Sequence, residues 1–195
     1  MKIASIKTAL LAASLPLASF ATPALAHDHG QATVATYAPI TQAEVEAAQQ
    51  AWGQALVAIS TEHDTKGFAA AKRLAETVLD TAYGYNMGPV LFKPTLTLAP
   101  QTFRTSRDGA LAYFVGGDRN FPNDSGFALK GWRGYKIDNA GVVITGNSAI
   151  SMGNVTLTDA KGNVTKVDKT WGYVRDGQGK LRIVLHHSSL PYTAK

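Results

Sequence analysis

Two histidines and two serines follow one another directly at the end of an apolar segment near the C-terminus. The segment 181–185 is apolar apart from one arginine, and it runs into His186, His187, Ser188 and Ser189. Imidazole accepts and donates protons near neutral pH, and hydroxyl groups hold an anion or a water molecule by hydrogen bonds. These residue types therefore indicate proton transfer or anion binding at this point of the chain.

The β-branched and leucine residues before the histidines predict a strand over residues 181–189. Successive side chains of a strand point to opposite faces, so His186 and Ser188 share one face while His187 and Ser189 share the other. Only one of the two pairs can face the interior, and the alternation alone leaves open which one. A solvated edge strand with satisfied hydrogen bonds is the alternative without a functional role.

The first 26 residues have the pattern of a secretory signal peptide. Lys2 and Lys7 form a basic start, an apolar stretch spans 10–20, and Ala24-Leu25-Ala26 is a small-residue cleavage site before His27. The apolar stretch is too short for a membrane-spanning helix. We therefore expect a periplasmic or secreted protein with no membrane attachment after cleavage of residues 1–26.

The remaining sequence predicts one domain that needs no disulfides. Residues 27–38 are small and polar and predict a flexible mature N-terminus, and residues 39–195 are long enough to bury one core. The chain has no cysteine, which excludes disulfides and thiolate chemistry. Its net charge of +5 is not gathered into a run of Lys and Arg, so no nucleic-acid partner is expected.

Two helices are predicted before the strands begin. Thr41 and Glu44 fit a capping box, and apolar residues then recur every three to four positions as far as Ile59. Trp52 lies on this apolar stripe and is expected in the core. A second helix is predicted over 65–82, and its inner stripe is Phe68, Ala71, Ala75, Val78, Leu79 and Ala82. His63 is then expected in the short connection, exposed to solvent.

From Met87 onward the pattern changes to strands and turns. Pro94 marks the stretch 90–98 as an edge strand or a bulge, and residues 119–134 have the composition of a long loop. Further strands are expected over 111–115, 141–152, 155–158, 164–174 and 181–189. Helices followed by antiparallel hairpins predict an α+β fold in which the helices cover one face of a curved sheet.

Several separate segments carry a resemblance to a known family. Thr170-Trp171-Gly172-Tyr173-Val174-Arg175-Asp176 and the terminal Leu-His-His-Ser-Ser-Leu-Pro-Tyr segment are similar to the association domain of calmodulin-dependent kinase II. With the segments 87–95 and 113–118 and the pair Phe121-Pro122, the chain resembles the exported bacterial iota-class carbonic anhydrases. The resemblance implies the nuclear-transport-factor-2-like fold, a cone-shaped curved antiparallel sheet with N-terminal helices on its concave face.

The resemblance also implies an activity and a site. The activity is the reversible hydration of carbon dioxide to bicarbonate without a metal or other cofactor, in a pocket inside the cone. Carried over by motif, the catalytic residues are Thr95, Tyr113, His186 and Ser188, while His187 and Ser189 compete as substrate-binding residues on the other face. His186 would act as a base or orient a hydroxyl relay. Because an exposed sheet face commonly pairs in this fold, we expect a homodimer.

A zinc hydratase is a less favourable interpretation of the same histidines. Outside the N-terminal tail only His63, His186 and His187 are available for a three-histidine site. The last two are adjacent in a predicted strand and point to opposite faces. The spacing therefore disfavours a mononuclear zinc site.

Two other classes of function fit the fold. A non-enzymatic cone domain that binds a ligand or assembles oligomers has no need for converging hydroxyl groups. A cone-fold isomerase or hydrolase needs an acidic base, for which Asp168 is the nearest candidate. Its neighbours Lys166 and Lys169 indicate instead a pattern of surface charges.

Overall fold

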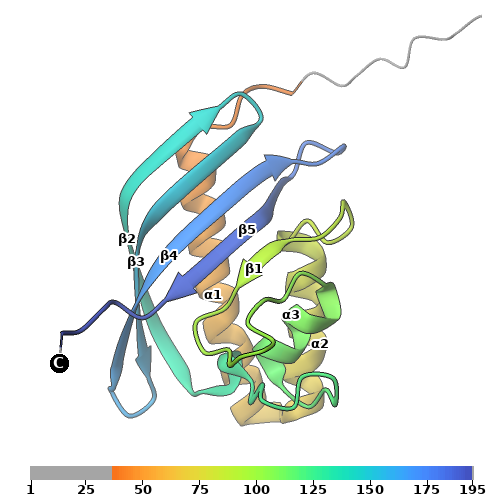
Figure 1. Ribbon diagram of the computed structural model, residues 1–195, viewed down its shortest axis with the longest axis vertical. Coiled ribbons are helices and arrows are strands. Elements are labelled where there is room, and N and C mark those ends of the chain that lie inside the picture. Colours follow the sequence, from red (N-terminus) through yellow and green to blue (C-terminus); the bar gives the residue numbers. More distant parts are fainter. Residues whose placement is uncertain (1–36, 195) are drawn as a thin grey trace, which may run out of the picture. The chain divides into compact units, whose positions relative to one another are not determined.

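The computed structural model describes residues 37–194, which form a layer of helices against a five-stranded sheet (Figure 1). The predicted signal peptide 1–26, and all but the last two residues of the segment 27–38, lie outside the described residues. The helices are α1 (Gln42–Lys66), α2 (Phe68–Ala82), α3 (Arg107–Val115) and the 3-10 helix η1 (Phe127–Leu129). The strands are β1 (Leu91–Lys93), β2 (Trp132–Thr145), β3 (Ser148–Asp159), β4 (Val164–Arg175) and β5 (Leu181–Ser189).

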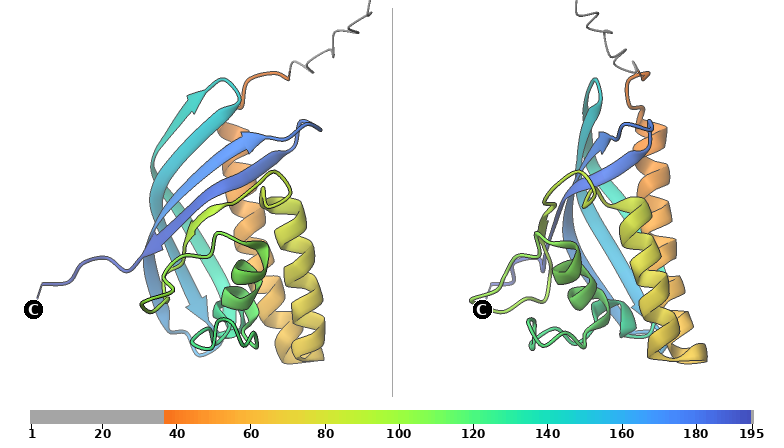
Figure 2. Two further views of the ribbon diagram at one scale, coloured as in Figure 1. Left: turned by 45° about the vertical axis from the view of Figure 1, so that its right-hand side comes forward. Right: turned by 90° about the vertical axis from the view of Figure 1, so that its right-hand side faces the viewer.

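The strands lie in the order β1-β5-β4-β3-β2, and they curve around α1 as Figure 2 shows. The ladders from β2 to β5 are antiparallel, whereas the short edge strand β1 runs parallel to β5. All the helices lie on one side of the sheet, its concave face. The predicted α+β fold with helices inside a curved sheet is confirmed, with one parallel edge pairing that the sequence did not indicate.

The core fills the space between α1 and the concave face of the sheet. Trp52, Leu56 and Ile59 of α1 are buried, as the helical spacing predicts, and Trp52 meets Trp171 of β4 edge to face at 5.6 Å between ring centroids. Burial of such large apolar side chains is the main favourable term in folding. Within residues 37–194, no helix is long and apolar enough to cross a membrane.

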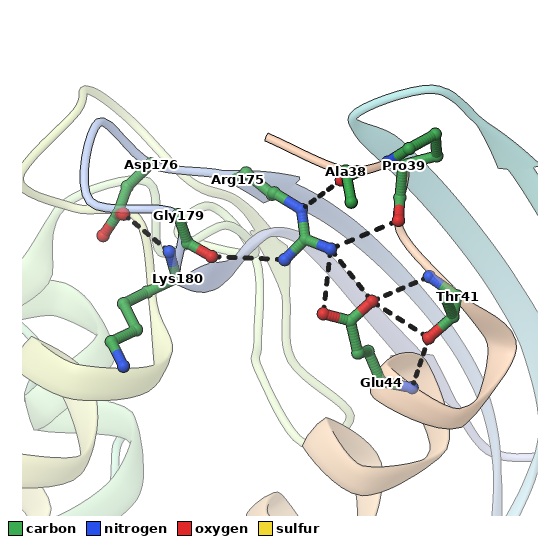
Figure 3. Close-up of polar contacts among 8 residues, drawn as sticks. All are labelled: Ala38, Pro39, Thr41, Glu44, Arg175, Asp176, Gly179 and Lys180. Atoms are coloured by element: carbon green, nitrogen blue, oxygen red, sulfur yellow. Dashed lines mark hydrogen bonds and ion pairs between the residues drawn. The ribbon is translucent and has the colours of Figure 1, made fainter. Parts of the chain in front are cut away.

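The start of α1 is tied to the far end of the sheet (Figure 3). The capping box forms, because the Glu44 amide donates to the Thr41 hydroxyl while the Glu44 carboxylate accepts from the Thr41 amide. The same carboxylate accepts from Arg175 at the end of β4, at 2.8 and 2.9 Å. The hydrogen bonds from the Thr41 backbone and from the Arg175 guanidinium lower the pKa of Glu44, because both stabilise the charged carboxylate. This contact sets where α1 begins relative to the strands.

One predicted strand is a helix. Residues 111–115 belong to α3, which begins where the Ser106 hydroxyl accepts from the Gly109 amide and ends at Gly116. Six of its nine residues are buried, so both sides of the helix are apolar. A short helix that is apolar all round has no helical period and cannot be distinguished from a buried strand by pattern.

Other predicted boundaries were also wrong. The stretch 141–152 is not one strand, because Gly146, with φ +56°, and Asn147 turn the chain between β2 and β3. Gly-Asn is a hairpin signal that the apolar run concealed. His63 lies in the last turn of α1 rather than in a connection, and Phe68 of the predicted inner stripe is 43% exposed. The strand expected over 90–98 is shortened to three residues before Pro94.

Candidate active site

The structure decides which face of β5 looks inward. His186 and Ser188 are each 1% exposed and lie on the concave face, whereas His187 is exposed and Ser189 half-buried on the outer face. The predicted alternation therefore holds over residues 186–189. Nearer the start of the strand it breaks, because the register of the β4–β5 ladder shifts between Ile183 and Leu185, and Ile183 and His186 are both buried. His187 and Ser189, expected as possible substrate-binding residues, are not brought to the buried cluster, because they point away from the core.

Two hydroxyl groups from distant segments lie near Ser188: that of Thr95 contacts Ser188 directly, and that of Tyr113 contacts Thr95. Thr95 lies in the turn that follows β1 and Pro94, and its hydroxyl hydrogen-bonds the Ser188 hydroxyl at 2.5 Å. Tyr113 comes from α3 and is 5% exposed. Burial raises the pKa of the Tyr113 phenol well above its ordinary value, while hydrogen bonds with the Leu96 backbone and with Thr95 act in the opposite direction. The phenol therefore stays protonated and remains a hydrogen-bond donor.

His186 is held on both ring nitrogens. Its Nδ1 lies 2.9 Å from the hydroxyl of Tyr83, which itself accepts from the indole N–H of Trp52 at 3.0 Å. Its Nε2 lies 2.6 Å from Nζ of Lys169, and its ring stacks on Phe92 with centroids 4.4 Å apart. A neutral imidazole has one N–H and one lone pair, and here each of them has a partner in either tautomer.

The electrostatics of His186 follow from its surroundings. Burial lowers its pKa well below the ordinary value, and electrostatic repulsion from the neighbouring basic side chains of Lys169 and His187 lowers it further. The imidazole is therefore neutral. Because its lone pair is already engaged, this geometry suits orientation of neighbouring groups better than direct removal of a proton from water.

Lys169 was interpreted as a surface residue, and that interpretation was wrong. It is 3% exposed, its Nζ lies 4.4 Å from the Trp52 ring centroid, and no carboxylate of residues 37–194 forms an ion pair with it. Burial lowers the pKa of the Lys169 ammonium to about 7. Asp168 and Lys166, on the other face of β4, are exposed as expected. The lysine faces inward because it lies on the same face of β4 as Val167 and Trp171, which are both buried.

Tyr83 also escaped the sequence analysis. It stands directly after α2, is 1% exposed and joins Trp52 to His186 through its hydroxyl. Nothing in the local sequence separates it from an ordinary core aromatic. Lys169 could have been found, because strand alternation from Trp171 places it on the inner face.

One hollow of the molecule lies away from this cluster. A surface groove of about 710 Å³ between α1 and β2 is lined by residues such as Gln54, Arg133 and Tyr135, and by none of the cluster residues. Within residues 37–194, no three His, Asp or Glu side chains come together as a possible metal site. The buried cluster therefore remains the best candidate for chemistry. Its members are Trp52, Tyr83, Thr95, Tyr113, Lys169, His186 and Ser188.

Comparison with known proteins gives one consistent result. Residues 43–190 match the family model described as metal-independent carbonic anhydrase. A metal-independent carbonic anhydrase from Nostoc sp. (strain PCC 7120) is 65% identical over 153 residues, which cover 78% of this chain and 75% of the relative.

Solved structures extend the comparison to the fold. The iota-carbonic anhydrase of a cyanobacterium, in a crystal structure with bicarbonate, is 63% identical with a TM-score of 0.79, over 80% of this chain and 95% of the other. A calcium/calmodulin-dependent protein kinase II association domain from Xanthomonas campestris is 24% identical with a TM-score of 0.53, over 82% and 98% of the two chains. The second likeness concerns the fold alone. The family match spans all the segments that carry the cluster residues.

Proposed function

This chain belongs to the metal-independent carbonic anhydrases, which hydrate carbon dioxide reversibly to bicarbonate, and we propose that its reaction takes place at Ser188, Thr95 and Tyr113. The observation that carries the proposal is the 2.5 Å contact between the Thr95 and Ser188 hydroxyls beside a buried phenol. The related cyanobacterial structure is a complex with bicarbonate. An oxyanion of that size needs the closely spaced donors that these hydroxyls supply.

The chemistry places negative charge on oxygen. As water attacks the carbon of carbon dioxide, electrons move onto the carbon dioxide oxygens, and the water must lose a proton. Preorganised hydroxyl donors in a dry site stabilise that charge far better than bulk water does. Ser188 and Tyr113 can each donate one hydrogen bond to it, while Thr95 holds the Ser188 hydroxyl in place.

His186 serves this site as a positioning residue. Its ring is fixed by Tyr83, Lys169 and the stacked Phe92, and it stands two residues before Ser188 on the same face of β5. Rigid neighbours keep a hydroxyl within the narrow range of positions that an oxyanion requires. Loss of the imidazole would therefore act through the position of Ser188.

The experiment compares two serines of one strand. Carbon dioxide hydration is measured by stopped flow on chelator-treated wild type, Ser188→Ala and Ser189→Ala. Removal of one preorganised donor costs about 10²–10³-fold in rate, and we expect that loss for Ser188→Ala alone. Ser189→Ala changes the same atoms on the outer face and should keep wild-type turnover. Tyr113→Phe should resemble Ser188→Ala.

Circular dichroism and urea unfolding show whether each variant is folded. Equal activity of folded Ser188→Ala and wild-type protein would refute the assigned site. No hydration by the wild type would refute the function itself.

The homodimer remains a proposal. On the outer face of the sheet, Ile150 and Met152 of β3 are 55% and 59% exposed, and Val143 of β2 lies opposite Ile150 in the ladder. Side chains of this size on neighbouring strands form an apolar surface that a second copy of the chain can cover.

Export is also proposed, from the sequence pattern alone. The signal-peptide features of residues 1–26 support a periplasmic or secreted protein. The mass of the mature chain tests this, because cleavage would leave His27 as the first residue.

A further inference from the structure

A lysine amine occupies the centre of the buried cluster. Lys169 reaches from β4 to His186 on β5, with 2.6 Å between its Nζ and the imidazole Nε2. The side chains around this amine are Trp52 of α1, Trp171 of its own strand, and His186 and Ser188 of β5. Tyr83, at the end of α2, contacts the other side of His186, and Tyr113 of α3 contacts Thr95. None of these groups carries a negative charge.

The register brings this amine close to the hydroxyl groups. Lys169 and Ser188 are cross-strand partners in the β4–β5 ladder, so their side chains lie on the same face. His186 and Ser188 are two positions apart on that face, a separation of roughly 6.6 Å along a strand. A water molecule with carbon dioxide, or one bicarbonate, spans such a gap with a hydrogen bond at each end.

Trp171 adds a second donor to the same space. Its indole N–H is buried and has no hydrogen-bond acceptor within residues 37–194, and its ring centroid lies 5.7 Å from Lys169 Nζ. A buried donor without an acceptor carries a cost unless a bound molecule accepts from it. An oxygen atom of a ligand next to Lys169 would supply that acceptor.

We propose that Lys169, rather than His186, accepts the proton released when water attacks carbon dioxide. The inference rests on the proposed function, since it concerns the same site and reaction. His186 and Tyr83 are then positioning residues that hold the amine beside Ser188.

The step balances without any other reactant. The water oxygen forms a bond to carbon, one C=O electron pair moves onto oxygen, and the water proton passes to the neutral amine. The products are bicarbonate and the Lys169 ammonium, two opposite charges formed together from neutral reactants. The ammonium then releases its proton to the solvent buffer, and the neutral amine returns.

The electrostatics agree with this order of events. Burial without a carboxylate lowers the pKa of Lys169 to about 7, so much of the lysine is neutral at physiological pH. A base whose pKa lies near the working pH combines availability with driving force. His186 is a poorer acceptor, because its pKa lies well below the ordinary value and its lone pair is engaged.

Three variants test the inference by the pH profile of hydration. The wild-type kcat/KM should rise with pH and level off above about pH 7. Lys169→Met should lose about 10²–10⁴ in rate, the usual contribution of a general base, and the remaining rate should have no inflection near pH 7. Lys169→Arg should be equally inactive, because a guanidinium keeps its proton. Lys166→Met, on the exposed face of β4, is the matched control and should keep the wild-type profile.

A second measurement does not depend on turnover. In lysine-labelled protein, the ε-carbon NMR signal that is missing from Lys169→Met should titrate near pH 7 in the wild type. Titration of that signal near pH 10 would overturn the inference. So would activity in Lys169→Arg, or an unchanged pH profile in Lys169→Met. A wild type that does not hydrate carbon dioxide would refute the proposed function, whereas an active wild type with an unaffected Lys169→Met variant would refute only the role of Lys169.

Discussion

Replacing Lys169 by methionine should make the protein more stable at pH 7, and this gain should shrink as the pH rises. The reason is that burial lowers the pKa of this lysine from 10.5 to about 7 in the folded protein. In the unfolded chain the amine is hydrated and keeps its ordinary value. The wild type therefore bears a folding cost that a methionine does not have.

The direction of this pH dependence follows from the number of protons that the folded and unfolded states bind. Below pH 7 the lysine is charged in both states, and the full cost is present. Between pH 7 and 10.5 the unfolded chain binds more protons than the folded one, so the stability of the wild type rises with pH by about 1.4 kcal/mol per unit. From pH 7 to 9.5 the difference between wild type and Lys169→Met should change by about 3 kcal/mol.

The Lys169→Met variant also has a cost in stability that does not depend on pH. Methionine leaves Nε2 of His186 without its partner at 2.6 Å, which costs about 1–3 kcal/mol at every pH. We therefore expect Lys169→Met to be more stable than the wild type by about 2 kcal/mol at pH 7 and close to it at pH 9.5.

Urea unfolding at several pH values between 7 and 9.5 measures this difference. Lys166→Met is the control, because the Lys166 side chain is exposed on the same strand and should give a difference independent of pH. Ionisation of tyrosines in the unfolded chain affects all three proteins equally and cancels. A constant difference between wild type and Lys169→Met over the whole range would show that the lysine is charged in the fold, and the reasoning would be refuted.

Two further predictions concern the surroundings of the site. Tyr83→Phe leaves the indole N–H of Trp52 and Nδ1 of His186 without a partner, so urea unfolding should show a loss of about 2–4 kcal/mol. A stability equal to that of the wild type would contradict the assigned network. Ile150→Lys places a charge on the outer face of the sheet and should convert a dimer to a monomer in sedimentation velocity, with hydration per subunit unchanged. A wild type that is monomeric at all concentrations would refute the dimer.

Local patterns predicted the elements whose faces differ most. The capping box at Thr41 and the apolar spacing of α1 are confirmed, because only one side of that helix faces the core. Alternation along β5 correctly separated His186 and Ser188 from their neighbours. Patterns failed at α3, where six of nine residues are buried, and at the turn between β2 and β3, which interrupts an apolar run by two residues.

The sequence by itself therefore determined the fold class, the family motifs and the pairing of His186 with Ser188 on one face of β5. It also offered Thr95 and Tyr113 as partners, although from segments far apart. Only the tertiary structure decided which face of β5 points inward, because that depends on which side of the sheet α1 covers. It alone placed Lys169 and Tyr83 on either side of His186, because these contacts at 2.6 and 2.9 Å join separate elements. Alternation along β4 indicates that Lys169 faces inward, but not which group it meets.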